Sequence, residues 1–521
     1  MAASPLPPAR ADLIDQPYGR NAMRRGTRDF LIGKAISAAM SFAIMLLLVR
    51  LLPLQQFGVY VTWLALLELA HAIGGVGLPW VALRYLPEFR LYASSNSLRR
   101  FVRRWLAGVL LATVAVVLMS AAGLSAYLAW SDMQEHHFAA AIFLAAIGFE
   151  LAGRHMREGL LEPLMQQLAS RISLILRQSV MLAAVLTLWY AGELRLIWVV
   201  AAELVASLVG AVSAWVLMRR HLASLNGTGA TGDWTEPAFS AMWRTAIHMF
   251  GAQLVSLSYG PAMLTVVAQR TLGLEATALF GFLRQLCEQV WRYLPSIVLM
   301  GVVRPKLVAA YCVGGMFELS RISAVVAKMT ILTAAPVIVF AAIAGSDLIV
   351  LLSGGKFQGS GWLFFGLTLS LLPMGLRQLY EAAAVTTGRS ELCMRASLSG
   401  LLTLPLLYAL VSNDFGLWAL VIVFVVGHLL FVGVVAFGLS RAVGFSIDAV
   451  GLGRVMVAGA IAWGLLAAWA WPASNWGVIL VQGLAVTLLF LLAAYGLRPF
   501  NLQERQLLDS LVGRRWFARQ A

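Results

Sequence analysis

The sequence predicts an all-α membrane protein that crosses the bilayer about 14 times. Of its 521 residues, 60% are hydrophobic and only 12% are charged, and the mean hydropathy is +0.82. A soluble domain carries about 25% charged residues. Apolar stretches of about 20 residues, the length of a transmembrane helix, recur along the whole chain. Together these features exclude a soluble enzyme, a disordered protein and a secreted disulfide scaffold.

The first apolar stretch follows a polar, arginine-containing segment, residues 1–28. It runs from Phe30 to Leu52 and is too long for the apolar part of a signal peptide, so we expect an uncleaved first helix. The expected helices occupy residues 29–51, 58–86, 105–130, 138–161, 168–191, 195–218, 242–269, 275–304, 322–345, 361–387, 391–412, 416–439, 454–472 and 476–497.

The arginines predict the orientation of these helices. Clusters precede the first helix, follow the last one and lie between helices two and three, as at Arg99, Arg100, Arg103 and Arg104. The loops on the other side are short and contain few basic residues. Because basic loops stay in the cytoplasm, we expect both termini there. The net charge of +15 is therefore interpreted as an orientation signal, with no nucleic-acid partner.

The chain is expected to form two lobes joined by a linker. Ser224–Ser240 is rich in Gly, Ser and Thr and lies near the middle of the chain, as in a flexible connection. Leucines and arginines after Arg498 favour an interfacial helix on the inner leaflet. The expected parts are a cytoplasmic tail at 1–28, an N-terminal lobe at 29–220, a linker at 221–241, a C-terminal lobe at 242–440, two further helices at 441–497 and a cytoplasmic interfacial tail at 498–521.

The two lobes have features of a six-helix repeat. An offset of about 220 residues places Glu68 on Glu288, and one of about 223 places the pair Arg154 and Glu158 on Arg377 and Glu381. Repeats of this kind in transporters place the substrate site at their interface. Glycines and prolines interrupt several helices and are candidate hinges or static kinks, at Gly74, Gly75, Gly77, Pro79, Gly260, Pro261, Pro295 and Pro373.

Charged residues inside the expected helices are the candidate site residues. An isolated charge at mid-membrane costs about 3 kcal/mol on insertion scales, so each must face protein, water or cargo. The substrate-binding candidates, mostly in the cytoplasmic half, are Lys34, Arg154, Arg244, Arg284 and Arg377, and the ion-coupling candidates are Glu68 and Glu288. Structural alternatives stay open: the Arg–Glu pairs four residues apart could only stabilise helices, and Arg244 could extend to the inner surface.

No motif for catalysis, a cofactor or a metal is found. The three cysteines are scattered without metal-ligand spacing, and the sequence contains no P-loop, nucleophile elbow or paired acidic motif. The expected outer loops are short, whereas a polysaccharide polymerase or ligase would need a large outer region for its acceptor. We therefore expect a transporter without a cofactor, and a membrane glycosyltransferase or ligase is the alternative from another class.

Two segments resemble a known family. Gly33–Trp63 (GKAISAAMSFAIMLLLVRLLPLQQFGVYVTW) and Asp347–Phe365 (DLIVLLSGGKFQGSGWLFF) are similar to polysaccharide transporters of the Wzx oligosaccharide-flippase type. These belong to the MOP superfamily, together with MATE exporters and the lipid II flippase. The resemblance implies two six-helix lobes plus two helices, in a bacterial inner membrane. It implies outward transport of undecaprenyl-pyrophosphate-linked oligosaccharide by alternating access, with a polysaccharide polymerase and export machinery as candidate partners.

The resemblance leaves two transporter alternatives, a lipid II flippase and a MATE-type antiporter. Bacterial MATE exporters usually carry an acidic ion-binding residue in the first helix. Here that helix contains Lys34, with Asp29 only at its entrance, which argues against a cationic drug as cargo.

The expected orientation can be tested by labelling single cysteines in a cysteine-free variant. Cysteines at Ser131 or Ser474 should react with a membrane-impermeant thiol reagent on intact spheroplasts, because both positions lie in expected outer loops. A cysteine at Ser224 should react only after lysis. The reverse pattern would overturn the orientation and the direction of transport.

Overall fold

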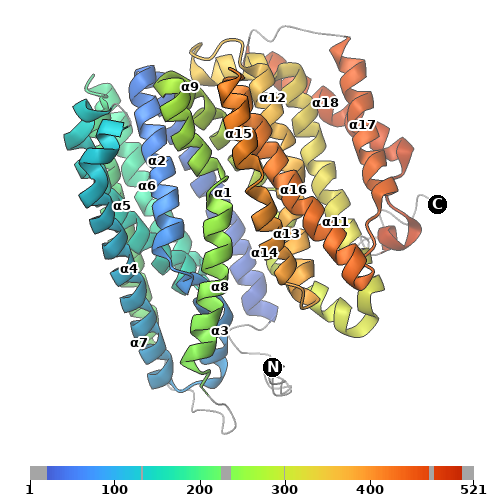
Figure 1. The fold of residues 1–521 in the computed structure, drawn as a ribbon, viewed down its shortest axis with the longest axis horizontal. Helices are drawn as coiled ribbons and strands as arrows, with labels where there is room; N and C mark the ends of the chain where they lie inside the picture. Colours follow the sequence, from blue (N-terminus) through green and yellow to red (C-terminus); the bar gives the residue numbers. More distant parts are fainter. Residues whose placement is uncertain (1–19, 131–132, 225–235, 299, 469–474, 507–521) are drawn as a thin grey trace. The chain divides into compact units, whose positions relative to one another are not determined.

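The computed structural model describes residues 20–130, 133–224, 236–298, 300–468 and 475–506, and this part of the chain is helical (Figure 1). Most of the expected tail at 1–28, the centre of the linker at 221–241 and the end of the tail at 498–521 lie outside the described residues. The described residues form two compact units. Unit 1 comprises those up to Leu52 and Leu66–Gln253; unit 2 comprises Pro53–Ala65 and those from Leu254 onward.

Unit 1 is built on four long helices that pack beside one another (Figure 1). Helix α5 contacts both α4 and α7, and α6 packs on α7 and α1. The helices of this unit are α1 (Arg20–Leu51), α3 (Leu78–Tyr92), α4 (Ser95–Trp130), the 3₁₀ turn η2 (Gln134–His136), α5 (His137–Met156), the π-helical turn η3 (Arg157–Leu161), α6 (Gln167–Tyr190) and α7 (Leu196–Ser224).

Two helices are divided between the units. Helix α2 (Leu54–Gly74) begins in unit 2 and ends in unit 1, and α8 (Phe239–Leu257) begins in unit 1 and ends in unit 2. The helices of unit 2 are α9 (Pro261–Trp291), α10 (Pro295–Val298), α11 (Met300–Ser353), α12 (Gly361–Leu369), α13 (Leu371–Thr386), α14 (Glu391–Gly400), α15 (Thr403–Ser412), α16 (Leu417–Val443), α17 (Ala449–Ala467) and α18 (Trp476–Leu497).

Several boundaries differ from those expected, and glycine or proline is the cause. The expected helix at 58–86 is two helices, α2 and α3, which are separated by a turn that contains Gly77. The helix expected at 242–269 breaks at Gly260 and Pro261. Gly273 has φ 84° and ψ 176°, a conformation open to glycine but not to residues with a Cβ, and it ends one helical stretch within α9 and starts the next.

The membrane-protein prediction is confirmed. In the described part of the chain, 12 helical ranges are long and apolar enough to cross a bilayer. One of them, Met242–Trp291, contains both α8 and α9, and the shorter α12 and α13 are outside this set. The expected number of about 14 therefore agrees with the helices once α8 and α9 are separated and α12 and α13 are taken together.

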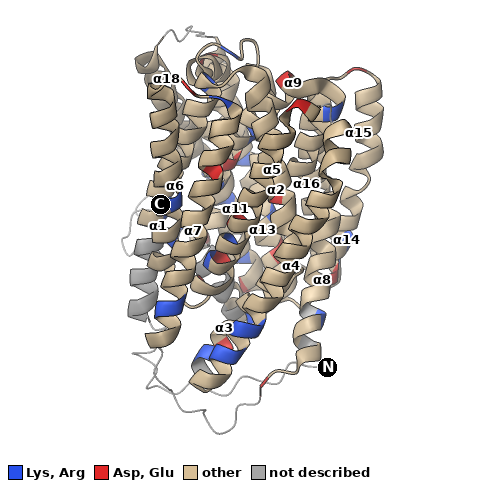
Figure 2. Cartoon of the chain, turned by 90° about the vertical axis from the view of Figure 1, so that its left-hand side faces the viewer, with Lys and Arg blue, Asp and Glu red and all other residues tan. Residues whose placement is uncertain are grey.

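The surface of these helices is apolar, and part of their charge lies inside. Leu111 and Leu118 on α4 are 72% and 63% exposed, and Leu484 on α18 is 69% exposed. By contrast Arg157, Glu203 and Lys328 are among the buried residues, and charged residues are few along the ribbon (Figure 2). Apolar side chains outside and paired charges inside are what a bilayer requires.

One buried ion cluster fastens the end of unit 2. The Nζ of Lys328 on α11 donates hydrogen bonds to both carboxylate oxygens of Glu504, at 2.8 and 2.6 Å, and pairs with Asp448 before α17. Glu504 also accepts a hydrogen bond from the backbone of Asn501 at 2.8 Å. Burial alone would raise the pKa of Asp448, but the hydrogen bond from Lys328 outweighs it and lowers that pKa.

The Lys328 cluster should stabilise unit 2. Replacing Glu504 with Gln keeps the side-chain shape but removes one of two carboxylates from a fully buried ammonium, at a cost of about 3 kcal/mol. We expect a lower melting temperature in detergent and faster proteolysis after α18. Gln503→Ala, at an exposed neighbouring position, is the control and should melt like the wild type. Because the pKa of Asp448 is lowered in the folded state, its share of the stability is present near neutral pH and is lost only in acid.

Candidate functional site

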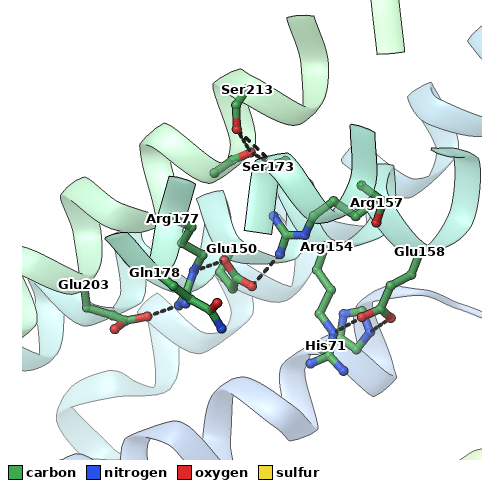
Figure 3. A network of polar contacts seen from close by, with 12 residues as sticks. His71, Glu150, Arg154, Arg157, Glu158, Ser173, Arg177, Gln178, Glu203 and Ser213 are labelled. Atoms are coloured by element: carbon green, nitrogen blue, oxygen red, sulfur yellow. Dashed lines mark hydrogen bonds and ion pairs between the residues drawn. The ribbon is translucent and has the colours of Figure 1, made fainter. Parts of the chain in front are cut away.

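Four charged side chains meet inside unit 1 (Figure 3). Glu150 lies on α5, Arg157 in the turn η3, Arg177 on α6 and Glu203 on α7. Arg157 donates to one oxygen of Glu150 at 2.8 Å, and Arg177 lies 2.6 Å from the other. Arg177 also pairs with Glu203. We call these residues the buried network; with two arginines and two glutamates, its formal charge is zero.

The buried network depends on small residues between α5 and α7. A Cβ at Gly153 would lie 3.1 Å from both the backbone of Ala211 and the guanidinium of Arg157, so a larger residue would force the helices apart. Ser173 on α6 donates to the carbonyl of Gly210 at 2.9 Å. The π-helical turn η3 inserts an extra residue per turn at Arg157 itself. Local sequence thus places two arginines around one carboxylate.

A second group lies beside the buried network and is partly accessible. Arg154 on α5 donates to Glu158 at 2.9 Å, and these side chains are 34% and 48% exposed. The Nε2 of His71 on α2 lies 3.7 Å from the other oxygen of Glu158. The ring of His71 stacks on that of His155 with centroids 4.6 Å apart, and His155 is only 2% exposed. We call Arg154, Glu158, His71 and His155 the histidine group.

Unit 2 contains a corresponding arginine with different neighbours. Arg377 on α13 donates to Glu381 at 3.2 Å and to Ser256 at 3.2 Å. Its guanidinium lies 3.9 Å from the ring centroid of Phe431 on α16, a cation–π contact. His428 on the same helix turns its Nδ1 to the carbonyl of Phe424 at 2.9 Å, so this histidine does not bind the carboxylate.

The other candidates from the sequence differ in exposure. Arg284 on α9 is 1% exposed, with its Nε 3.4 Å from Glu288. Lys34 on α1 is half-buried, and Arg244 on α8 is exposed. Glu68 lies on α2, near enough to Arg154 to act on it electrostatically. The structure thus brings Arg154 and Glu68 together within unit 1, and Arg284 and Glu288 within unit 2.

A further carboxylate lies in the turn between η3 and α6. Glu162 accepts hydrogen bonds from Arg171 at 2.7 Å and from Ser170 at 3.0 Å. Burial raises the pKa of Glu162, although the charge of Arg171 opposes the shift. Arg171 is therefore paired at the end of the membrane-spanning segment and is not simply extended toward water.

Sequence analysis did not identify most of the buried network. Glu150, Arg157 and Glu203 have no partner at helical spacing, since Arg177 and Glu203 are 26 residues apart. The signal that could have found them is their charge inside apolar segments. No group of three or more His, Cys, Asp or Glu residues suited to a metal occurs in the described ranges.

This fold and its internal charges define a multi-pass membrane protein with the architecture of MOP-superfamily transporters. The model of the family described as polysaccharide biosynthesis protein matches residues 24–307, more than half of the chain, so the chain belongs to that family. The resemblance drawn from the sequence is thereby confirmed. No curated protein matches the chain in sequence.

Solved structures share the fold at low sequence identity. The lipid II flippase MurJ in an inward closed conformation has a TM-score of 0.69 and 12% identity, covering 89% of this chain and 97% of that one. An inward-facing MATE-family multidrug resistance transporter of the MOP superfamily has a TM-score of 0.57 and 12% identity, covering 80% and 98%. The Vibrio cholerae MATE transporter VcmN has 0.55 and 14%, covering 82% and 97%.

The buried network should be a stabilising element. Glu203→Gln leaves Arg177 and Arg157 with a single carboxylate in a buried site, where removing one partner costs about 3–5 kcal/mol. We expect a clearly lower melting temperature in detergent. Replacing Arg177 and Glu203 together with Met removes a positive and a negative charge and should recover part of the loss.

A matched control is available at the end of α6. Glu193 and Arg195 form an ion pair of 3.8 Å, and both are more than half exposed. Glu193→Gln should change stability by less than about 1 kcal/mol. Equal effects of Glu203→Gln and Glu193→Gln would show that the buried network contributes no special stability.

Proposed function

We propose that this protein is a flippase for undecaprenyl-pyrophosphate-linked oligosaccharide repeat units in a bacterial inner membrane. It would serve the synthesis of lipopolysaccharide O-antigen, exopolysaccharide or capsule by alternating access. The membership of the polysaccharide biosynthesis family supports the pathway. The fold shared with a lipid II flippase supports movement of a lipid-linked molecule.

One observation carries the proposal, namely a partly accessible arginine–glutamate pair in each unit. Arg154 and Glu158 lie at the end of α5, and Arg377 and Glu381 lie on α13. Each guanidinium is held by a carboxylate but retains accessible surface, 34% for Arg154 and 23% for Arg377. Guanidinium groups bind phosphate bidentately, so each unit offers a group suited to a pyrophosphate.

The remaining basic candidates have different roles in this proposal. Arg244, which is exposed, and Lys34, which is half-buried, would attract the anionic head group by charge. Arg284 is 1% exposed and bound to Glu288, so it would meet the cargo only after the helices rearrange. Glu68 and Glu288 are the proposed coupling carboxylates, since both lie beside arginines inside helices.

The transporter alternatives differ in their cargo. A lipid II flippase is the closer alternative, because the similarity in fold to MurJ extends over more of this chain than that to the MATE transporters. Lys34 in α1 argues against a MATE-type exporter of cations. A glycosyltransferase or ligase is disfavoured by the shared transporter fold.

Charge reversal in either pair should stop transport. Arg154→Glu or Arg377→Glu should abolish flipping, whereas the corresponding Lys variants should retain part of it, because the charge stays and the bidentate contact is lost. Losing one charge-assisted contact of about 1.5–3 kcal/mol predicts a decrease of roughly tenfold or more. The readout is lipid-linked oligosaccharide accumulating on the cytoplasmic face, at matched protein levels.

The control for this assay is Arg441→Glu, at an exposed position at the end of α16. It should leave the rate nearly unchanged. Glu68→Gln and Glu288→Gln enter the same assay under imposed pH gradients. Normal flipping by a well-expressed Arg154→Glu, Arg377→Glu double variant would contradict the proposal.

A further inference from the structure

The two histidines of the histidine group have an unusual environment for buried side chains. His71 and His155 stack with their rings 25° apart in orientation. The Nδ1 of His71 and the Nε2 of His155 are buried and have no hydrogen-bond partner among the described residues. Buried polar atoms normally have one. Each imidazole therefore has a nitrogen available to bind a proton.

The charged groups that face this pair come from both packed helices. From α5 and η3 they are Arg154, Glu158 and Glu150. On α2 itself Glu68 lies one turn before His71 and acts on Arg154. Glu150 is already shared by the two arginines of the buried network. Glu158 is thus the carboxylate in contact with His71, at 3.7 Å.

We propose that His71 and His155 form a single proton-binding site whose occupancy is coupled to the binding of an anionic phosphate group at Arg154. This inference rests on the proposed function for the phosphate, but not for the proton. Two imidazolium rings 4.6 Å apart repel each other, so the stacked pair holds one proton. That proton comes from water and is stabilised by Glu158.

The coupling follows from the arrangement of charge. In the structure Glu158 is bonded to Arg154 through one oxygen and faces His71 with the other. A proton on His71 draws the carboxylate toward the imidazolium and adds one positive charge next to Arg154. The guanidinium is then less neutralised and binds a phosphate more strongly. By linkage the phosphate raises the proton affinity by the same factor.

The corresponding pair in unit 2 lacks this device and therefore provides a control. His428 is buried near Arg377 and Glu381, but its ring is hydrogen-bonded to the carbonyl of Phe424. Its Nδ1 has a fixed partner and no carboxylate contacts the ring in the described structure. A His428→Gln variant should keep whatever proton coupling the wild type has.

The test uses the full-length protein in lipid nanodiscs and a prenyl-pyrophosphoryl-N-acetylglucosamine probe. Both phosphates of this probe are diesters, so its charge stays constant between about pH 5 and 8, the range in which histidine titrates. Isothermal titration calorimetry in buffers of different ionisation enthalpy counts the protons taken up on binding. We expect net proton uptake, at most one per probe, and an affinity that rises by up to about tenfold for each unit of decreasing pH.

The variants separate the proton site from a merely structural role. His71→Gln should bind the probe with an affinity independent of pH and without proton uptake, and Glu158→Gln should reduce the uptake. His428→Gln should behave as the wild type. Wild-type binding without proton uptake, or unchanged uptake in His71→Gln, would overturn the inference.

A separate measurement distinguishes failure of this inference from failure of the proposed function. If the probe does not bind at any pH, the proposed cargo is wrong, and ¹⁵N-histidine NMR of the ligand-free protein decides about the proton site. A ring-nitrogen resonance that titrates between about pH 5 and 8 and disappears in His71→Gln would uphold the site. If neither His71 nor His155 titrates in that range, the site is excluded.

Discussion

Charge inside a membrane must be balanced by opposite charge, and this requirement organises the interior of both units. A lone charge at mid-membrane costs about 3 kcal/mol on insertion scales, so a transporter that needs arginines for an anionic cargo must also contain carboxylates. The buried network balances two arginines with two glutamates, and Lys328 lies between Asp448 and Glu504. The helices then present apolar side chains outward.

The same requirement is met differently in the two units. Arg154 shares its carboxylate with an imidazole, whereas Arg377 is bound by Glu381 and Ser256 and covered by the ring of Phe431. An aromatic face stabilises a guanidinium independently of pH, but an imidazole changes its charge near neutral pH. The repeat has kept the arginine–glutamate pair and changed its neighbours, which gives only unit 1 the chemistry of a proton sensor.

Local patterns in the sequence were sufficient for the fold class and for the short-range pairs. Apolar segments predicted the helices, and Gly77, Gly260 and Pro261 lie where helices break. Arg154–Glu158 and Arg377–Glu381 were visible at four-residue spacing. Pairs that join distant helices were not, because no spacing rule connects Lys328 with Glu504, 176 residues later. Such pairs depend on tertiary packing.

The difference in burial decides which charges a cargo can displace. Separating a buried ion pair costs about 3–5 kcal/mol, so the buried network, with Glu203 at 2% exposure, cannot release its arginines to each passing phosphate. An exposed pair contributes about 0.2–1 kcal/mol. Arg154–Glu158, at 34% and 48% exposure, lies between these limits but closer to the second. A phosphate that brings two oxygens to Arg154 therefore replaces Glu158 at little cost, and the freed carboxylate already has His71 beside it to receive a proton.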